Sequence, residues 1–203
     1  MEKIILIGGS PTAGKSYTAR KIADVLKLPW ISTDTIREQM REIVRKEDYP
    51  NLYIFSDSSS KEATEFFSQN SPEDIVKHQN AESLDVWKGV EAIVEKDYVW
   101  GSFIVEGVAI LPYLVDKISV KDKDVRKVFL IDDDIERVRE IIFNRGLWDD
   151  ANKYSDEVKE KEVEWVMEFN KYIIDEAEKY NFPIIKIGDR KEYLEQIIDL
   201  IKK

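Results

Sequence analysis

The sequence predicts an α/β fold: a five-stranded parallel sheet with helices on both faces, carrying a helical insertion and a lid. Five short runs of apolar and β-branched residues lie at 3–7, 29–32, 102–105, 125–131 and 182–187. Each run is continuous rather than alternating, as in strands that are covered on both faces. Between the runs, apolar residues recur at the i, i+3, i+4, i+7 spacing of amphipathic helices. Strands that alternate with helices favour a parallel sheet.

Composition narrows the class of protein. A chain of 203 residues with 43% hydrophobic and 35% charged residues is typical of one globular domain, residues 1–203. It carries 31 basic and 41 acidic residues, a net charge of −10, which disfavours a nucleic-acid partner. The absence of cysteine excludes disulfides, zinc–thiolate sites and thiol nucleophiles. Without a membrane-length apolar run or a signal-peptide pattern, we expect a cytoplasmic protein with no membrane partner.

The first strand leads into a glycine-rich loop, GSPTAGKS at residues 9–16. It fits the P-loop pattern G-x4-G-K-S, and an apolar helical stripe follows it, which is the context that the pattern requires. Glycines let the backbone approach phosphates, while the lysine reaches the β- and γ-phosphates and the serine ligates Mg²⁺. We therefore expect ATP and Mg²⁺ as cofactors, with Ser16 as a metal ligand and Lys15 as a catalytic residue. The expected nucleotide-binding residues of this loop are Gly9, Thr12, Ala13, Gly14, Lys15, Ser16 and Tyr17.

The second strand is followed by Asp34 and Arg37. A carboxylate at the carboxyl end of this strand faces the P-loop across the crevice of the sheet. Asp34 is therefore a candidate to take the proton of an acceptor hydroxyl, and Arg37, one helical turn on, to bind an anionic acceptor. The alternative is structural: a helix N-cap at Asp34 or Thr33, with Arg37 on the surface.

Residues 35–101 are too many for one crossover and predict a helical insertion that covers the substrate site. The expected parts are helical residues 35–46, a serine-rich loop at 56–60 and helical residues 71–96. Ser71 followed by Pro72 and two acids is a typical helix start.

The third strand ends in Glu106 followed by Gly107. A GTPase would need Asn-Lys-x-Asp, and the nearest strings, at 152–155 and 170–173, lack the aspartate. A lone acid at this strand end resembles the pattern of P-loop kinases for nucleotides and metabolites. That resemblance implies that Glu106 supports Mg²⁺ and borders the substrate.

Residues 132–155, after the fourth strand, predict a lid. P-loop kinases supply arginines to the transferring phosphoryl group, and Arg145 and then Arg137 are the candidates here. Arg145 continues the apolar stripe of the predicted lid helix and is expected to point inward. After the last strand, Arg190 is placed to stack on adenine. The alternative for the lid arginines is ion pairing with Asp133, Glu136 or Asp149.

Several segments together resemble 2-phosphoglycerate kinases. They are residues 32–37, 78–83 (HQNAES), 89–93 and 104–112 (IVEGVAILP). The similarity covers about residues 3–115. It implies the nucleoside monophosphate kinase-like form of the P-loop fold and transfer of a phosphoryl group from ATP to 2-phosphoglycerate.

The combined hypothesis is an ATP-dependent phosphotransferase acting on a hydroxyl of a small, anionic metabolite. One alternative is a nucleotide-binding regulatory protein or slow ATPase without an acceptor, which Ala109 favours because the family's motif has histidine there. Another is a kinase for nucleotides, nucleotide sugars or polynucleotide ends. The sequence leaves the acceptor and the oligomeric state open.

Overall fold

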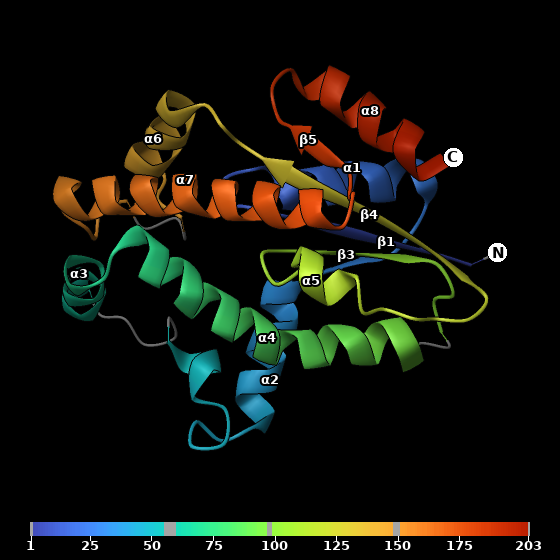
Figure 1. The fold of residues 1–203 in the computed structure, drawn as a ribbon, viewed down its shortest axis with the longest axis horizontal. Helices are drawn as coiled ribbons and strands as arrows, with labels where there is room; N and C mark the ends of the chain where they lie inside the picture. The colour runs from blue at the N-terminus through green and yellow to red at the C-terminus, as the bar shows by residue number, and fades with distance from the viewer. Residues whose placement is uncertain (1, 55–59, 97–98, 148–150, 203) are drawn as a thin grey trace.

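A computed structural model describes residues 2–54, 60–96, 99–147 and 151–202. Its centre is one five-stranded sheet in which every pairing is parallel, in the order β2-β3-β1-β4-β5. The strands are β1 (Glu2–Gly9), β2 (Trp30–Ser32), β3 (Phe103–Glu106), β4 (Lys123–Ile131) and β5 (Ile184–Lys186). All five correspond to the predicted apolar runs, so the predicted sheet is confirmed (Figure 1).

The helices connect these strands in sequence. They are α1 (Lys15–Leu26), α2 (Thr33–Ile43), α3 (Ser60–Gln69), α4 (Pro72–Lys96), α5 (Pro112–Val115), α6 (Ile135–Asn144), α7 (Asp156–Lys179) and α8 (Arg190–Lys202), with a 3₁₀ turn, η1, at Pro50–Tyr53. None of the helices in the described residues is both long enough and apolar enough to span a membrane.

Alternate side chains of β1 point to two separate cores, because successive residues of a strand face opposite sides of the sheet. Ile4 and Leu6 belong to the core formed with α4, α5 and α7. Ile5 and Ile7 belong to the core formed with α1 and α8. The sheet is therefore covered on both faces, as its continuous apolar strands predict.

The chain between β2 and β3 contains α2, η1, α3 and α4. Helix α4 starts as predicted, with the Oγ of Ser71 accepting a hydrogen bond from the N–H of Asp74 at 3.2 Å. Helix α3 was not predicted, and Ser60, which the sequence placed in a loop, begins it. The rest of that predicted loop, residues 56–59, lies outside the described residues. Helix α3 is stabilised by tertiary contact, since the ring of Phe67 lies 6.1 Å from that of Trp165 on α7.

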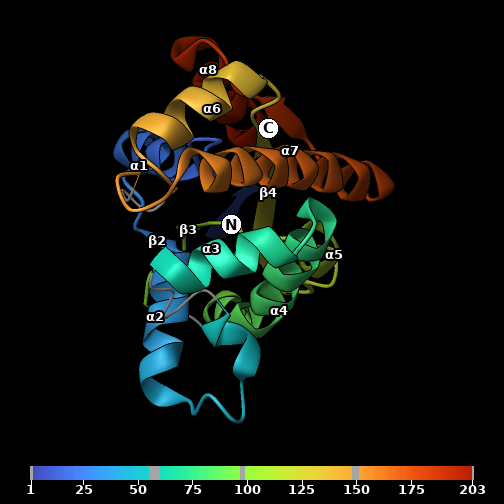
Figure 2. The same ribbon diagram turned by 90° about the vertical axis from the view of Figure 1, so that its left-hand side faces the viewer.

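Helix α7 lies between α6, within the predicted lid region, on one side and α3 and α4 on the other, as both views of the ribbon show (Figures 1 and 2). Val163 and Val166 of α7 are buried together with Val138 and Ile142 of α6. Since α7 also contacts β4, one helix joins the lid, the inserted helices and the sheet.

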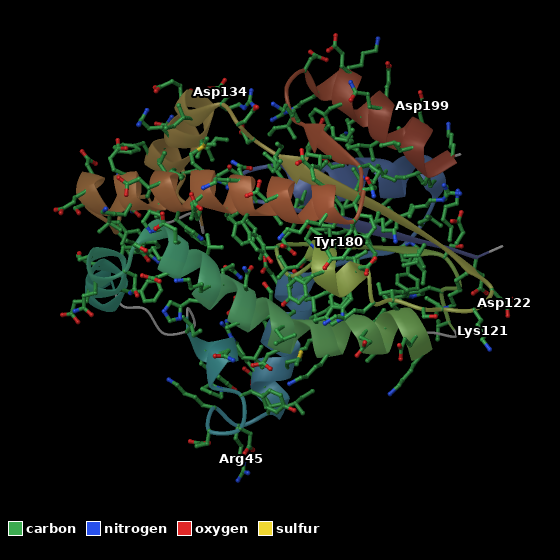
Figure 3. The ribbon with its side chains drawn as sticks, in the orientation of Figure 1. Arg45, Lys121, Asp122, Asp134, Tyr180 and Asp199 are labelled. Atoms are coloured by element: carbon green, nitrogen blue, oxygen red, sulfur yellow. The ribbon has the colours of Figure 1, made fainter. Side chains whose placement is uncertain are left out.

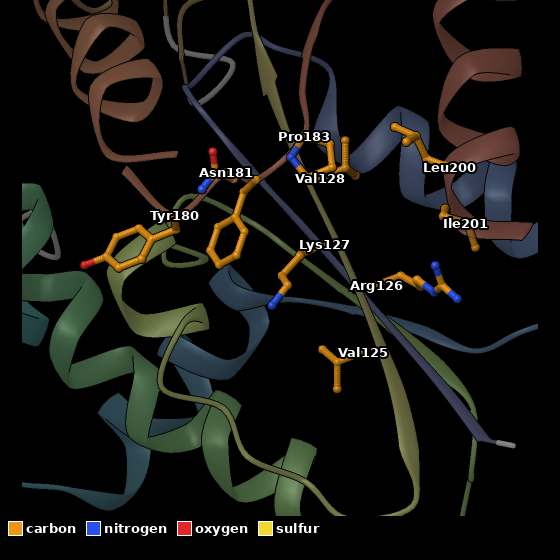
Figure 4. A pocket seen from close by; sticks show the side chains of 10 residues that line it. Val125, Arg126, Lys127, Val128, Tyr180, Asn181, Pro183, Leu200 and Ile201 are labelled. Carbon is orange, nitrogen blue, oxygen red and sulfur yellow. The ribbon is translucent and has the colours of Figure 1, made fainter. Parts of the chain in front are cut away.

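The fourth strand has an open edge over its first half. Strand β5 pairs only with residues 129–131 of β4. The N–H of Phe129 donates to the carbonyl oxygen of Pro183 at 2.9 Å, but proline has no N–H with which to extend the ladder. A hollow of about 460 Å³ lies beside this edge, at the amino ends of the strands, between residues 125–128, residues 180–183 and the end of α8 (Figure 4).

Candidate active site

The candidate site forms at the carboxyl ends of the parallel strands, where open α/β sheets bind their ligands. Strand β1 leads into the P-loop, and β3 ends at Glu106. In the sheet register Glu106 lies beside Ile7 of β1 and beside Ser32 of β2. Asp34 and Arg37, on the first turns of α2, follow directly from β2. The ends of two adjacent strands therefore bring Glu106, Asp34 and Arg37 to the same end of the sheet as the P-loop.

The P-loop requires its glycines for two different reasons. A Cβ at Gly9 would lie 2.0 Å from the carbonyl oxygen of Leu130, so a side chain would collide with β4. Gly14 is the N-cap of α1 and has a φ of 68°, a left-handed conformation that glycine adopts without strain. Between them Thr12 also has a positive φ, 66°. The loop is thereby wound so that Lys15 turns back, and its Nζ donates to the carbonyl oxygen of Ser10 at 2.6 Å.

Lys15 is buried close to two carboxylates. Burial lowers the pKa of Lys15, and the charges of Glu106 and then Asp34 oppose that shift. Burial likewise raises the pKa of Glu106, while the charge of Lys15 and a hydrogen bond from Ser16 act to lower it. The charges of Lys15, the predicted phosphate-binding residue, and of Glu106 and Asp34, the predicted Mg²⁺ ligand and base, thus act on one another.

Ser16 and Glu106 suit a Mg²⁺ ion. Their hydroxyl and carboxylate oxygens are the donors that Mg²⁺ prefers, and it is commonly held by one or two protein groups plus phosphates and water. Oε1 of Glu106 is buried and, among the described residues, has no hydrogen-bond partner. A buried carboxylate oxygen without a hydrogen-bond partner destabilises the fold unless a ligand such as a cation binds it. Ser16 and Glu106 therefore fit a Mg²⁺ ion.

A cleft of about 670 Å³ opens beside the P-loop. Its walls bring residues 12 and 14–17 together with Arg137, Arg145 and Arg190. The guanidinium of Arg190 lies 4.8 Å from the centre of the Tyr17 ring. All three arginines that the sequence assigned to nucleotide binding or phosphoryl transfer therefore line one cavity.

Arg137, the first of the two arginines of the predicted lid, is held by an aspartate and a backbone carbonyl. Nε of Arg137 donates to Oδ2 of the buried Asp132 at 2.9 Å, and Nη2 donates to the carbonyl oxygen of Ile187 at 3.0 Å. The predicted alternative had other partners, Asp133, Glu136 and Asp149; Asp149 lies outside the described residues, and the observed ion pairs of Arg137 are with Asp132 and Asp134.

Asp134, labelled in Figure 3, also caps α6 by accepting hydrogen bonds from the N–H groups of Glu136 and Arg137. Arg145 is the C-cap of α6 and is exposed, so it does not continue the buried stripe of the helix as the spacing predicts. The helix ends one residue too early to continue its buried stripe to Arg145, which instead borders the cleft.

On the acceptor side, Nη1 of Arg37 lies 3.1 Å from Oδ1 of Asp34. The cap of α2 is neither Asp34 nor Thr33 but Ser32, whose Oγ accepts from the N–H of Thr35 at 3.1 Å. The carboxylate of Asp34 is thus not used in capping and is 63% exposed. Although burial acts to lower it, the neighbouring carboxylates, Glu82 first, raise the pKa of Arg37.

Sequence reasoning missed the residues that support Arg37. Glu82 is 2% exposed, and Oε2 of its carboxylate lies 3.5 Å from Nη1 of Arg37. Nε2 of Gln79 donates to the same oxygen at 3.2 Å, and the other oxygen of Glu82, Oε1, lies 3.1 Å from Nη2 of Arg41. A signal existed: Gln79, Glu82 and Ser83 are polar residues at i, i+3, i+4 on the mostly apolar buried side of α4.

Comparisons with known proteins agree with this geometry. No family model matches the chain. It is 26% identical over 205 residues to the 2-phosphoglycerate kinase of Methanocaldococcus jannaschii and 29% identical over 212 residues to that of Methanothermobacter thermautotrophicus. These alignments cover 98% of this chain but 62% and 65% of those relatives. The chain thus spans less than two thirds of their length.

Solved structures resemble the fold. They include shikimate kinase from Acinetobacter baumannii in complex with shikimate (TM-score 0.53, 11% identity, 100% of this chain and 93% of that one). Another is TT1252 from Thermus thermophilus (TM-score 0.52, 15% identity, 98% and 95%). The chain therefore has the P-loop kinase fold and is distantly homologous, across its length, to 2-phosphoglycerate kinases.

Proposed function

We propose that the protein is an ATP-dependent phosphotransferase that moves the γ-phosphoryl group to a hydroxyl of a small anionic metabolite, of which 2-phosphoglycerate is the first to test. The observation that carries the proposal is that the charges of Glu106 and Asp34 both act on the buried P-loop lysine, Lys15, while Nη1 of Arg37 lies 3.1 Å from Oδ1 of Asp34. A protein that only binds nucleotide needs the P-loop but not a second polar site facing it.

The nucleotide side is formed by the P-loop and the arginines of the cleft. Lys15 leaves the carbonyl of Ser10 and binds the β- and γ-phosphates, and Arg190 with Tyr17 borders the base. Arg137 and Arg145 stand where charge develops on the transferring phosphoryl group. Ser16 and Glu106 would hold Mg²⁺, which would neutralise charge on the phosphates.

The acceptor side is formed by Asp34 and Arg37. Asp34 accepts the proton of the attacking hydroxyl, and its exposure leaves it accessible to an acceptor entering the site. Arg37 binds an anionic group of the acceptor. Two of its present partners, Asp34 and Glu38, are 63% and 58% exposed, so an incoming anion can replace them, while buried Glu82 keeps the guanidinium in place.

The test is transfer of labelled phosphoryl from ATP, with Mg²⁺ present, to a panel of compounds. The panel holds 2-phosphoglycerate, other phosphorylated hydroxy acids, uncharged polyols, nucleosides, nucleotide sugars and 5′-hydroxyl oligonucleotides. We expect a labelled product with an anionic hydroxyl compound and not with the uncharged polyols. ATP turnover that no compound changes would contradict the proposal and support a regulatory protein or slow ATPase.

A further inference from the structure

Asn170 is a polar residue on the buried face of α7, among apolar neighbours. It is 2% exposed, and Phe169 and Ile173 beside it are fully buried. Its Oδ1 accepts a hydrogen bond from the Oγ of Ser10 at 2.6 Å and from the N–H of Asp132 at 3.2 Å. Its Nδ2 donates to the carbonyl oxygen of Asp132 at 2.6 Å. One side-chain amide thus binds the P-loop and the residue after β4 simultaneously.

The hydrogen bonds continue on both sides of Asn170. On the P-loop side, the carbonyl oxygen of Ser10 accepts from Nζ of Lys15. On the other side, the carboxylate of Asp132 is paired with Arg137, which also donates to the carbonyl oxygen of Ile187. Through Ser10 and Asp132, these bonds connect the P-loop with the lid arginine, and the bond of Lys15 to Ser10 is the one that the phosphates of a nucleotide would replace.

We propose that Asn170 is a positioning residue for the nucleotide: it fixes the first turn of the P-loop at a set distance from Arg137. The inference rests on the proposed function in one respect, that a nucleoside triphosphate occupies the cleft. Its phosphates must contact Lys15 and Arg137 together, so the separation of the two sides decides how well both contacts form.

Only an amide meets the three requirements of this position. It supplies an acceptor for two donors and, on the adjacent atom, a donor for a carbonyl. Aspartate would place a second oxygen against the carbonyl of Asp132, and an apolar residue would leave the Ser10 hydroxyl and the Asp132 peptide groups buried without this partner. A residue needed only for packing on α7 would not require this chemistry.

The experiment compares Ser10→Ala, Asn170→Ala and the double variant with Ile173→Val, a matched control that removes one methylene three residues along α7. Equilibrium binding of a non-hydrolysable ATP analogue, KM and kcat for ATP turnover, and the thermal unfolding midpoint are measured for each. Ser10→Ala deletes one oxygen and leaves Asn170 bonded to Asp132, so it tests the link even where Asn170→Ala fails to fold.

We expect Ser10→Ala to weaken analogue binding by about fivefold, the worth of one neutral hydrogen bond, and to raise KM for ATP with little change in kcat. The double variant should bind within about twofold of Asn170→Ala, since both changes break the same link. Ile173→Val should lower the unfolding midpoint without changing KM.

Analogue affinity in Ser10→Ala equal to that of the unaltered protein would overturn the inference while leaving the proposed function intact. So would an Ile173→Val control that weakens binding as much as Ser10→Ala at equal loss of stability. An unaltered protein that does not bind the analogue would overturn both the inference and the proposed function.

Discussion

Oε1 of Glu82 lies 3.1 Å from Nη2 of Arg41, and neither side chain is more than 9% exposed. Arg41 also donates from Nε to the carbonyl oxygen of Leu52 in η1. Arg41 therefore connects α2 with η1 and α4 by an ion pair and a hydrogen bond. In our proposal Arg37, one turn earlier on α2, is the arginine that faces the acceptor. Burial raises the pKa of Glu82, while the charges of Arg37 and Arg41 act to lower it.

Replacing Arg41 should cost stability rather than specificity for the acceptor. Arg41→Met leaves a buried carboxylate with one partner fewer, and we expect a loss of about 3 kcal/mol in the free energy of unfolding, measured with urea. Arg45→Met is the control, because Arg45 is 78% exposed at the far end of the insertion and pairs with Asp48 (Figure 3). It should cost less than about 1 kcal/mol. Equal losses in the two variants would contradict the role of Arg41.

Asp34→Asn should separate transfer from nucleotide binding. Asparagine keeps the size of the side chain but cannot take the proton of the acceptor hydroxyl, and we expect transfer to slow by at least ~100-fold. Affinity for a non-hydrolysable ATP analogue should stay within a factor of about two, because the change leaves the P-loop untouched. Asp48→Asn, on the exposed turn before η1, is the matched control. Full transfer activity in Asp34→Asn would remove Asp34 from the chemistry.

As the pH is lowered, Mg²⁺-dependent ATP binding should be lost at a higher pH than it would be with a glutamate of ordinary pKa at position 106. Burial raises its pKa above the ordinary value of 4.5. Mg²⁺ requires the ionised carboxylate, so Mg²⁺-dependent ATP binding is present above the raised pKa and is lost as pH falls through it. Titration of ATP affinity against pH measures the midpoint. The variant Glu106→Gln should lack this acidic limb, and an unchanged limb would assign it to another group.

Replacement of Gly107 by alanine should destabilise the protein, whereas the same replacement of Gly188 should be tolerated. Gly107 has a φ of 147°, and an added Cβ would lie 1.8 Å from Oγ1 of Thr33. Gly107→Ala should therefore lower the free energy of unfolding by more than about 2 kcal/mol and displace the first turn of α2. An added Cβ at Gly188 meets nothing within 4 Å, so Gly188→Ala should stay within about 0.5 kcal/mol. Denaturant unfolding measures the free energy of unfolding of both variants. Similar losses of stability in the two would show that the close fit of Gly107 against Thr33 is not what makes a side chain intolerable there.

Local patterns predicted the sheet and the P-loop because both are determined by neighbouring residues. The strands are continuous apolar runs, and the loop between Gly9 and Ser16 is a contiguous motif with its own backbone geometry. Helix α3 was missed because its apolar residues, Ala63, Phe66 and Phe67, form a repeat of little more than one turn, too short to distinguish a helix from a loop. The cap of α2 was misplaced because Ser32, the last residue of β2, serves both elements.

The supporting residues of the site were beyond sequence reasoning for a different reason. Glu82 meets Arg41 across 41 residues of sequence, and Asn170 meets Ser10 across 160. No local spacing relates such partners, so only the fold identifies them. The sequence did contain one clue, the residue type. Where polar side chains interrupt the buried apolar stripe of a helix, each of them is expected to have a hydrogen-bond partner elsewhere in the fold.

Pro183 has a consequence for how copies of this protein behave in concentrated solution. Since it has no N–H to extend the ladder, β5 pairs, within the described residues, with no residue of β4 before Phe129, and an edge strand of this kind is one that another strand could join, the geometry from which aggregation starts. Along that stretch lie Asp124, Val125, Arg126, Lys127 and Val128. Three of these five are charged, and Nζ of Lys127 lies 4.4 Å from the centre of the Phe182 ring, beside the hollow. A foreign strand would have to displace these charges, so we expect this edge to resist pairing with another copy of the chain, while the ligand site lies elsewhere, at the carboxyl ends of the strands.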